Sequence, residues 1–257
     1  MLVLVEADVQ AVSRRAADLV AGLIGRNPRA VLGLAAGATP RGLYEELVRR
    51  NLDFSGVTVF GLDEYMDLPV DHPASCTDAV RRNLIGRVNL DPARIHLLDA
   101  IPPGDVTAYC AAHEARIAAA GGVDLQILGL GQNGHIGFNE PGSSLSAGTH
   151  AVALSASTRT VNRTGFPPPA EVPEAAVTMG IGTILAAKRV LLLATGAAKA
   201  EMVAKVVEGP LAARVPASAL QLHADAVVLL DSAAAAKLQY RDDYAAEAAM
   251  RFARSAG

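Results

Sequence analysis

The sequence contains no tryptophan, and its aromatic residues are only five tyrosines and five phenylalanines among 257 residues. A core of this composition is built mainly from alanine, valine and leucine, which agrees with the 51% hydrophobic content. The chain is long enough for an extensive core and still within the size of one α/β domain. We therefore expect residues 1–257 to form a single domain.

Cysteine is scarce as well, because Cys76 and Cys110 stand alone without a paired spacing. This usage excludes a disulfide framework and is typical of a reducing compartment, so we expect a cytoplasmic protein. The formal net charge of −3 provides no basic surface for nucleic acid. No apolar run is long enough to span a bilayer, and charges within residues 1–25 do not fit a signal peptide. We therefore expect neither a nucleic-acid nor a membrane partner.

What the chain does contain is a series of apolar runs bounded by glycine or aspartate. They are AVLGLAAG (30–37), VTVFGLDE (57–64), VDLQILGLG (123–131), RVLLLATG (189–196) and AVVLLD (226–231). Runs that are apolar on both faces are typical of parallel strands covered by helices on each side. We predict an α/β fold: a three-layer, open, mostly parallel sheet with helices on both faces, Rossmann-like.

Helical patterns lie between the apolar runs. Residues 8–25 and 232–254 are amphipathic, and residues 106–122 end at a glycine pair suited to a helix C-terminus. Thr39 and Pro40 are expected to be the N-cap and first-turn proline of a further helix.

The stretch FPPPAEVPE (166–174) is rich in proline. Its prolines exclude a helix interior and a central strand, so we expect an exposed loop. Two roles remain open for it, a surface connection or part of a lid segment over residues 157–175.

Polar side chains gather in the glycine-rich stretch LGLGQNGHIGFNEPGSSL, residues 128–145, directly after an apolar run. The carboxyl edge of a parallel sheet, where such a loop would lie, is where open α/β folds bind ligands. A lone histidine is more often structural than catalytic. His135 with the Glu140 carboxylate and the Asn133 amide in one loop indicates general acid/base chemistry.

Two other loops indicate an anion site. The amides of Gly37, Ala38 and Thr39 lie where a strand passes into a helix, although a plain turn would have the same pattern. Lys199 falls in the first turn of another helix, where a cation is disfavoured unless it shares an anion with the backbone amides. These residues together predict a phosphate site.

An acidic pair, Asp63 and Glu64, directly follows an apolar run. Burial makes such a pair costly unless it is hydrogen-bonded or functional, so Asp63 either caps the next turn or acts as a base. The six histidines and the acidic residues show no metal-ligand spacing, so we expect no metal and no cofactor. The inventory suits proton transfer on a small phosphorylated substrate.

These segments make the chain resemble the glucosamine-6-phosphate deaminase family, also called glucosamine-6-phosphate isomerase. The similarity is found in GLAAGATPRGLYEEL (33–47), FGLDEYMDLP (60–69), GLGQNGHIGFNEPGSSL (129–145), VPEAAVTMGIGTIL (172–185), TGAAKAEM (195–202) and SALQLHADAVVLLD (218–231).

The resemblance implies an enzyme of amino-sugar metabolism, which we assign to the hydrolase class. It would convert glucosamine 6-phosphate and water to fructose 6-phosphate and ammonia. The alternatives are a deaminase for galactosamine 6-phosphate, a 6-phosphogluconolactonase-type hydrolase on the same fold, and a non-catalytic sugar-phosphate-binding regulator. The expected partner is a small-molecule sugar phosphate, and whether the chain forms a homo-oligomer stays open.

The resemblance also assigns roles to residues. Asp63 matches the base that moves a proton between C2 and C1, and His135 matches the acid/base that opens the sugar ring. Glu140 matches the carboxylate that supports the histidine. Asn133 stands where members of the family have Asp or Asn. An amide there can accept a hydrogen bond from an imidazole N–H, but it cannot stabilise imidazolium charge as a carboxylate would.

In the family's phosphate site, the 37–39 turn and Lys199 match two elements. A third is an arginine, and here the register departs from the family pattern. Arg163 is one position early, Thr164 takes the matching position, and Arg159 is another candidate. We name Arg163 as the third phosphate ligand.

The resemblance further bears on regulation, because some members use a second anion site after the FNEP element. Ser143 and Ser144 match its serines, but His150 and Val152 stand where regulated members have Arg and Lys. Since histidine is largely neutral at pH 7, the sequence predicts no activation by N-acetylglucosamine 6-phosphate.

Overall fold

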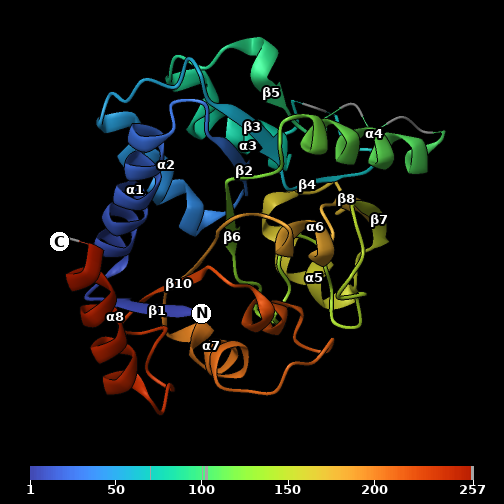
Figure 1. Ribbon diagram of the computed structural model, residues 1–257. Helices are drawn as coiled ribbons and strands as arrows, with labels where there is room; N and C mark the ends of the chain where they lie inside the picture. Colours follow the sequence, from blue (N-terminus) through green and yellow to red (C-terminus); the bar gives the residue numbers. More distant parts are fainter. Residues whose placement is uncertain (70, 100, 102–103, 256–257) are drawn as a thin grey trace.

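The computed structural model describes residues 1–69, 71–99, 101 and 104–255. Within them, a seven-stranded sheet in the order β1-β10-β9-β6-β2-β3-β5 crosses the molecule, with its paired strands parallel (Figure 1). The strands are β1 Leu2–Glu6, β2 Val31–Leu34, β3 Thr58–Gly61, β5 Ile95–His96, β6 Leu125–Gly129, β9 Val190–Ala194 and β10 Ala226–Asp231. Each of the five apolar runs contains one of these strands.

Helices cover both faces of this sheet. The helices are α1 Val9–Arg26, α2 Ala38–Arg49, α3 Cys76–Asn83, α4 Val106–Ala119, α5 Ala156–Asn162, α6 Ile181–Leu185, α7 Ala200–Val207 and α8 Arg241–Ser255. One apolar core includes side chains of α1, α2 and α3, and a second includes side chains of α4, α6 and α7. Alternate residues of β9 divide between them, with Leu191 and Leu193 in the first core and Leu192 and Ala194 in the second. The predicted three-layer α/β fold is confirmed.

A second sheet was not predicted. It is antiparallel, has the order β4-β8-β7, and consists of β4 Asp63–Tyr65, β8 Ala175–Thr178 and β7 His150–Ala153. The run 57–64 is therefore two strands rather than one, since the chain leaves the large sheet after Gly61 and pairs with β8. The pairing partner lies more than 100 residues away, so local periodicity could not reveal it.

Helix boundaries agree with the sequence patterns except at two places. The α2 helix begins at Ala38 with Gly37 in the N-cap position, so the prediction that Thr39 is the N-cap was wrong. The predicted C-terminal helix 232–254 begins only at Arg241, and α8 packs beside β1 (Figure 1). No described helix is both long enough and apolar enough to cross a membrane.

The proline-rich stretch 166–174 forms neither helix nor strand, as predicted. The expectation that it is exposed was wrong for Phe166 and Val172, which are buried. Both belong to a small apolar cluster that also contains Tyr65 and Phe138. The stretch is thus anchored on β4 and on the loop that follows β6.

Candidate active site

A cavity of about 440 Å³ lies at the carboxyl edge of the large sheet. Its lining comes from the ends of β2, β3, β6 and β9 and from the first turn of α3, and it includes Asp63, His135, Lys199 and the 37–39 turn. These residues are far apart in the sequence. Parallel strands bring them together because their carboxyl ends meet at one edge of the sheet.

The 37–39 turn faces the cavity with the start of α2. The first N–H groups of a helix have no acceptor within the helix, so this turn offers donors to an anion. Tyr44 fixes the preceding loop, because its hydroxyl donates to the Ala35 carbonyl at 2.8 Å. Thr39 Oγ1 lies 3.3 Å from Thr195 Oγ1, which joins this turn to the end of β9.

Lys199 approaches the same cavity from the short helical turn Ala197–Lys199 before α7. The turn is fixed by Asp231, whose two carboxylate oxygens each accept a hydrogen bond from Gly196 N at 3.0 Å. Partial burial lowers the pKa of the Lys199 amine. Among the described residues Lys199 forms no ion pair, so its charge is available to an anion in the cavity.

Asp63 begins β4 and lines the cavity beside Cys76. Burial of the carboxyl group and the nearby charge of Glu64 raise the pKa of Asp63 to about 7, while a hydrogen bond with the Cys76 thiol acts in the opposite direction. A carboxylate with a pKa near the working pH is suited to accept and return a proton. Gly137 makes room for the Thr178 hydroxyl beside Asp63, since a Cβ there would lie 2.6 Å from Thr178 Oγ1.

His135, Asn133 and Glu140 come together as predicted. Asn133 Oδ1 accepts from the backbone N of His135 at 3.2 Å, and Asn133 Nδ2 donates to Glu140 Oε2 at 2.8 Å. The Asn133 amide therefore contacts the His135 backbone and Glu140 rather than the imidazole N–H. His135 Nδ1 and Glu140 Oε1 are both buried without a hydrogen-bond partner among the described residues. Asn133 thus orients the loop and the carboxylate.

The surroundings of His135 favour the neutral form of its imidazole. Burial lowers the pKa of His135, the Glu140 carboxylate opposes this shift, and the Lys199 charge adds to it. Gly131 allows this placement, because a Cβ at Gly131 would lie 2.4 Å from atoms of the His135 ring. A neutral imidazole at the cavity wall can accept a proton from a hydroxyl group and then return it.

The structure does not bring Arg163 or Arg159 into this cavity. Arg163 donates to the Ala170 carbonyl at 3.0 Å, and Arg159 pairs with Glu174 at 3.1 Å. Both line a separate surface cavity of about 390 Å³. The Arg163 guanidinium is tied to the proline-rich loop in this arrangement of the segment, so its choice as a phosphate ligand stays a prediction.

The sequence reasoning assigned no role to two polar residues that support the site. Asn139 is fully buried and donates to the carbonyls of Ile136 and Met179, both at 2.8 Å. Asn162 of α5 donates to the Tyr65 hydroxyl at 2.8 Å, linking the expected lid segment to β4. The FNEP motif contains Asn139 and could have indicated its role, but nothing local connects Asn162 with Tyr65.

Comparison with known proteins agrees with this geometry. Residues 5–229 match the model of the family described as glucosamine-6-phosphate isomerases/6-phosphogluconolactonase. The chain belongs to this family. It is 49% identical to the glucosamine-6-phosphate deaminase of Pseudarthrobacter chlorophenolicus over 236 residues, which cover 91% of each chain. It is 44% identical to that of Clostridioides difficile over 246 residues, covering 94% of this chain and 98% of the relative.

Solved structures with the same fold include a glucosamine-6-phosphate deaminase and 6-phosphogluconolactonases. A structure described as a monomeric glucosamine-6-phosphate deaminase matches with a TM-score of 0.89 and 42% identity, covering 92% of this chain and 100% of its own. A 6-phosphogluconolactonase from Trypanosoma brucei matches with a TM-score of 0.75 at 22% identity, which shows the shared fold alone. The relatives' names describe deaminases, so the hydrolase class expected from the sequence is not supported.

Proposed function

We propose that this chain catalyses the isomerising deamination of glucosamine 6-phosphate to fructose 6-phosphate and ammonia. The main support is the single cavity that Asp63, His135, Lys199 and the 37–39 turn line together. The relative from Pseudarthrobacter chlorophenolicus, which is 49% identical, is named a glucosamine-6-phosphate deaminase.

In this proposal the phosphate binds to the amides of the 37–39 turn and to Lys199. The backbone N–H groups and one cation complement a dianion, and the helix dipole of α2 adds to the attraction. Anchoring the phosphate at one side of the cavity directs the sugar ring toward Asp63 and His135. Binding energy from the phosphate is then used to orient the reacting carbons.

The chemical steps follow from the two proton-transfer groups. His135 moves the ring-opening proton from the C1 hydroxyl to the ring oxygen and exposes the C1 aldehyde. Asp63 takes the C2 proton, O1 is protonated, and an enolamine forms. Return of a proton to C1 gives a C2 imine, which water hydrolyses to the ketose with release of ammonia. Each positioned proton transfer contributes about a hundredfold to ten-thousandfold to the rate.

Three further features belong to the proposal. The chain acts as one domain, with residues 157–175 as a lid whose contact with the site passes through Asn162 and Tyr65. The expected partner is a small sugar phosphate. The setting is the cytoplasm, which is supported by the free thiols of Cys76 and Cys110.

The decisive experiment is an ammonia-release assay with glucosamine 6-phosphate and, in parallel, galactosamine 6-phosphate. We expect ammonia and fructose 6-phosphate from the first and much slower release from its C4 epimer. Faster release from galactosamine 6-phosphate would change the assigned substrate. Hydrolysis of 6-phosphogluconolactone without ammonia release from either amino sugar would identify a lactonase, and binding without turnover would identify a regulator.

A further inference from the structure

Glu64 is a buried carboxylate next to the proposed base. It lies between Asp63 and Tyr65 on β4 and is 5% exposed. Successive side chains of a strand point to opposite faces, so Glu64 points away from the cavity that Asp63 lines. The proposed reaction does not use it. A buried carboxylate nevertheless requires hydrogen bonds to offset the loss of water.

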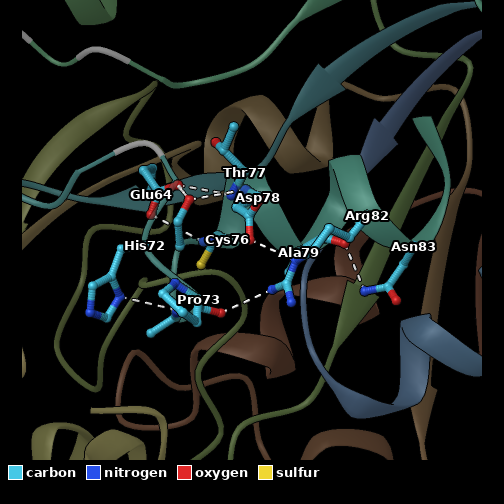
Figure 2. A network of polar contacts seen from close by, with 11 residues as sticks. Glu64, His72, Pro73, Cys76, Thr77, Asp78, Ala79, Arg82 and Asn83 are labelled. Atoms are coloured by element: carbon cyan, nitrogen blue, oxygen red, sulfur yellow. Dashed lines mark hydrogen bonds and ion pairs between the residues drawn. The ribbon is translucent and has the colours of Figure 1, made fainter. Parts of the chain in front are cut away.

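Those hydrogen bonds come largely from the first turn of α3, as Figure 2 shows. Glu64 Oε2 accepts from Ser75 Oγ at 2.5 Å and from Thr77 N at 2.8 Å. Glu64 Oε1 accepts from Cys76 N at 3.1 Å and from Tyr65 N at 2.8 Å. All four partners are donors, which matches an ionised carboxylate because that group only accepts.

The turn that Glu64 holds is also a wall of the active site. Ser75 and Cys76 line the cavity, and the Cys76 thiol shares a hydrogen bond with the Asp63 carboxylate. Ser75 Oγ additionally caps α3 by accepting from Asp78 N at 3.0 Å. The place of this wall relative to Asp63 is therefore fixed by the Glu64 carboxylate.

We propose that Glu64 is a positioning residue for the deamination, which fixes the first turn of α3 against β4 and keeps a negative charge beside Asp63. This inference rests on the proposed function, in which Asp63 is the base. It separates two contributions of one carboxylate. The first is geometric, through the α3 turn, and the second is electrostatic, through the charge.

The electrostatic contribution is favoured by the surroundings of the pair. Burial and then the Glu64 charge raise the pKa of Asp63 to about 7. The other titratable or charged groups around the pair are Tyr65 on β4, Cys76 on α3, Tyr44 on α2, Tyr109 on α4, and His135 and Lys199 at the cavity wall. The phenols and the thiol are neutral near pH 7, so Glu64 is the nearest fixed negative charge on the same strand.

Two substitutions separate charge from position. Glu64→Gln removes the charge and turns one acceptor oxygen into a donor, so we expect kcat to fall about tenfold or more. The acidic limb of the kcat/KM profile should also move to lower pH by about one unit. Glu64→Asp keeps the charge, but its side chain is one methylene shorter, so the carboxylate no longer reaches the donors of the α3 turn. It should lower kcat similarly and leave the acidic limb in place.

Asp124→Asn is the matched control. Asp124 is another buried carboxylate, and it lies at the amino ends of β6 and β2, away from the cavity. It accepts from Val31 N at 2.8 Å and from Lys188 Nζ at 2.6 Å. Its substitution should lower Tm but leave unchanged both kcat at pH 8 and the acidic limb of the kcat/KM profile. Equal kinetic losses in Asp124→Asn and Glu64→Gln would overturn the proposal, because general destabilisation would explain both.

A measurement without turnover distinguishes this proposal from the proposed function. Carboxyl ¹³C NMR of the ligand-free protein follows the titration of Asp63, and Glu64→Gln should lower its midpoint. An unmoved midpoint in the folded variant overturns the electrostatic role, whether or not the wild type releases ammonia. Should Glu64→Gln fail to fold, Glu64→Asp decides the geometric role, and wild-type kcat in that variant would overturn it. A wild type without ammonia release contradicts only the proposed function.

Discussion

Among the single residues of the cavity, Asp63 has a raised pKa and His135 has a lowered pKa. Burial is the leading cause of both shifts, because it disfavours the negative charge of Asp63 and the positive charge of His135. Asp63 is consequently able to take and give back a proton near neutral pH, while burial favours the neutral imidazole of His135. Such opposed shifts are the usual signature of paired acid/base groups.

Asp63→Asn tests the base directly. The amide preserves the shape but accepts no proton, so kcat should fall at least about a hundredfold while substrate binding changes little. Exchange of the C2 proton with solvent deuterium should stop as well. Asp67→Asn, an exposed aspartate just after β4, is the control and should keep wild-type rates. A kcat above about a tenth of wild type in Asp63→Asn would exclude the assigned role.

Lys199→Ala tests the phosphate site. Loss of one charge-assisted contact should raise KM about tenfold or more and make inorganic phosphate a weaker competitive inhibitor. The kinetic constants and the phosphate inhibition constant measure both effects. Lys205→Ala serves as the control, because Lys205 lies on α7 and pairs with Glu201 at 3.6 Å on the surface. An unchanged KM in folded Lys199→Ala would place the phosphate elsewhere and make Arg159 and Arg163 the candidates.

At the scale of elements, the loop after β6 depends on one buried amide. Asn139 ties this loop to its own Ile136 carbonyl and to Met179 at the end of β8. The main-chain N of Phe138 makes a further bond to Thr178 Oγ1 at 3.1 Å. The loop that presents His135 is thus fastened to the small sheet, and the small sheet also presents Asp63. Both proton-transfer groups depend on the same pairing of β4 with β8.

Asn139→Ala should therefore reduce stability and activity together. Loss of the two buried hydrogen bonds that the Asn139 amide donates should cost about 1–3 kcal/mol, and kcat should fall because His135 loses its support. Urea unfolding and steady-state kinetics measure the two effects. Gln221→Ala is matched, since its amide donates to Val206 O at 2.8 Å and Gly209 O at 3.0 Å away from the cavity. Full activity in Asn139→Ala would show that the loop holds His135 without this side chain.

At the scale of the whole molecule, His113 makes stability depend on pH. It is buried on α4 with its ring perpendicular to Phe60 of β3 at 5.6 Å, and burial followed by the Arg116 charge lowers the pKa of His113 to about 4. Its ordinary value is about 6.5, so between these values the unfolded chain binds more protons than the folded one. This contribution to stability is complete above pH 6.5 and decreases as pH falls toward 4.

We expect the free energy of unfolding to fall by about 2 kcal/mol from pH 7 to pH 5, because His113 takes up a proton in the unfolded chain and not in the folded one. Urea unfolding at the two pH values measures it, and His113→Leu should reduce the difference by about that amount. The comparison is made within each protein, so a different stability of the variant at pH 7 does not affect it. The same pH dependence in both proteins would show that other groups are responsible.

Regulation is also a property of the whole molecule. The resemblance predicts a second sugar-phosphate site after Ser143 and Ser144, and because this chain has His150 and Val152 where regulated members have Arg and Lys, we expect that site to have little positive charge. His150 Nδ1 lies 2.9 Å from its own chain's Gly148 carbonyl. We expect hyperbolic kinetics at pH 7, unaltered by N-acetylglucosamine 6-phosphate. A sigmoidal curve that this compound makes hyperbolic would mean that basic residues elsewhere complete the site.

Local patterns in the sequence are sufficient to predict the layers of the fold and the chemical groups of the site. Apolar runs such as 189–196 specify buried parallel strands because their residues are apolar on both faces. Glycine, amide and carboxylate side chains at the run ends identify the loops of the sheet edge, and these loops do line one cavity. Such patterns are local, so they could be recognised without knowing which segments meet.

Which polar groups face one another depends on tertiary packing. Residues 57–64 divide into two strands because β4 pairs with β8. The Asn133 amide is oriented by its hydrogen bond to Glu140. Arg163 lies outside the cavity, where it donates to the Ala170 carbonyl. The four donors around Glu64 likewise come together only when α3 packs on β4. A side chain takes its direction from packing partners that are distant in sequence, and its hydrogen bonds and pKa follow from that direction.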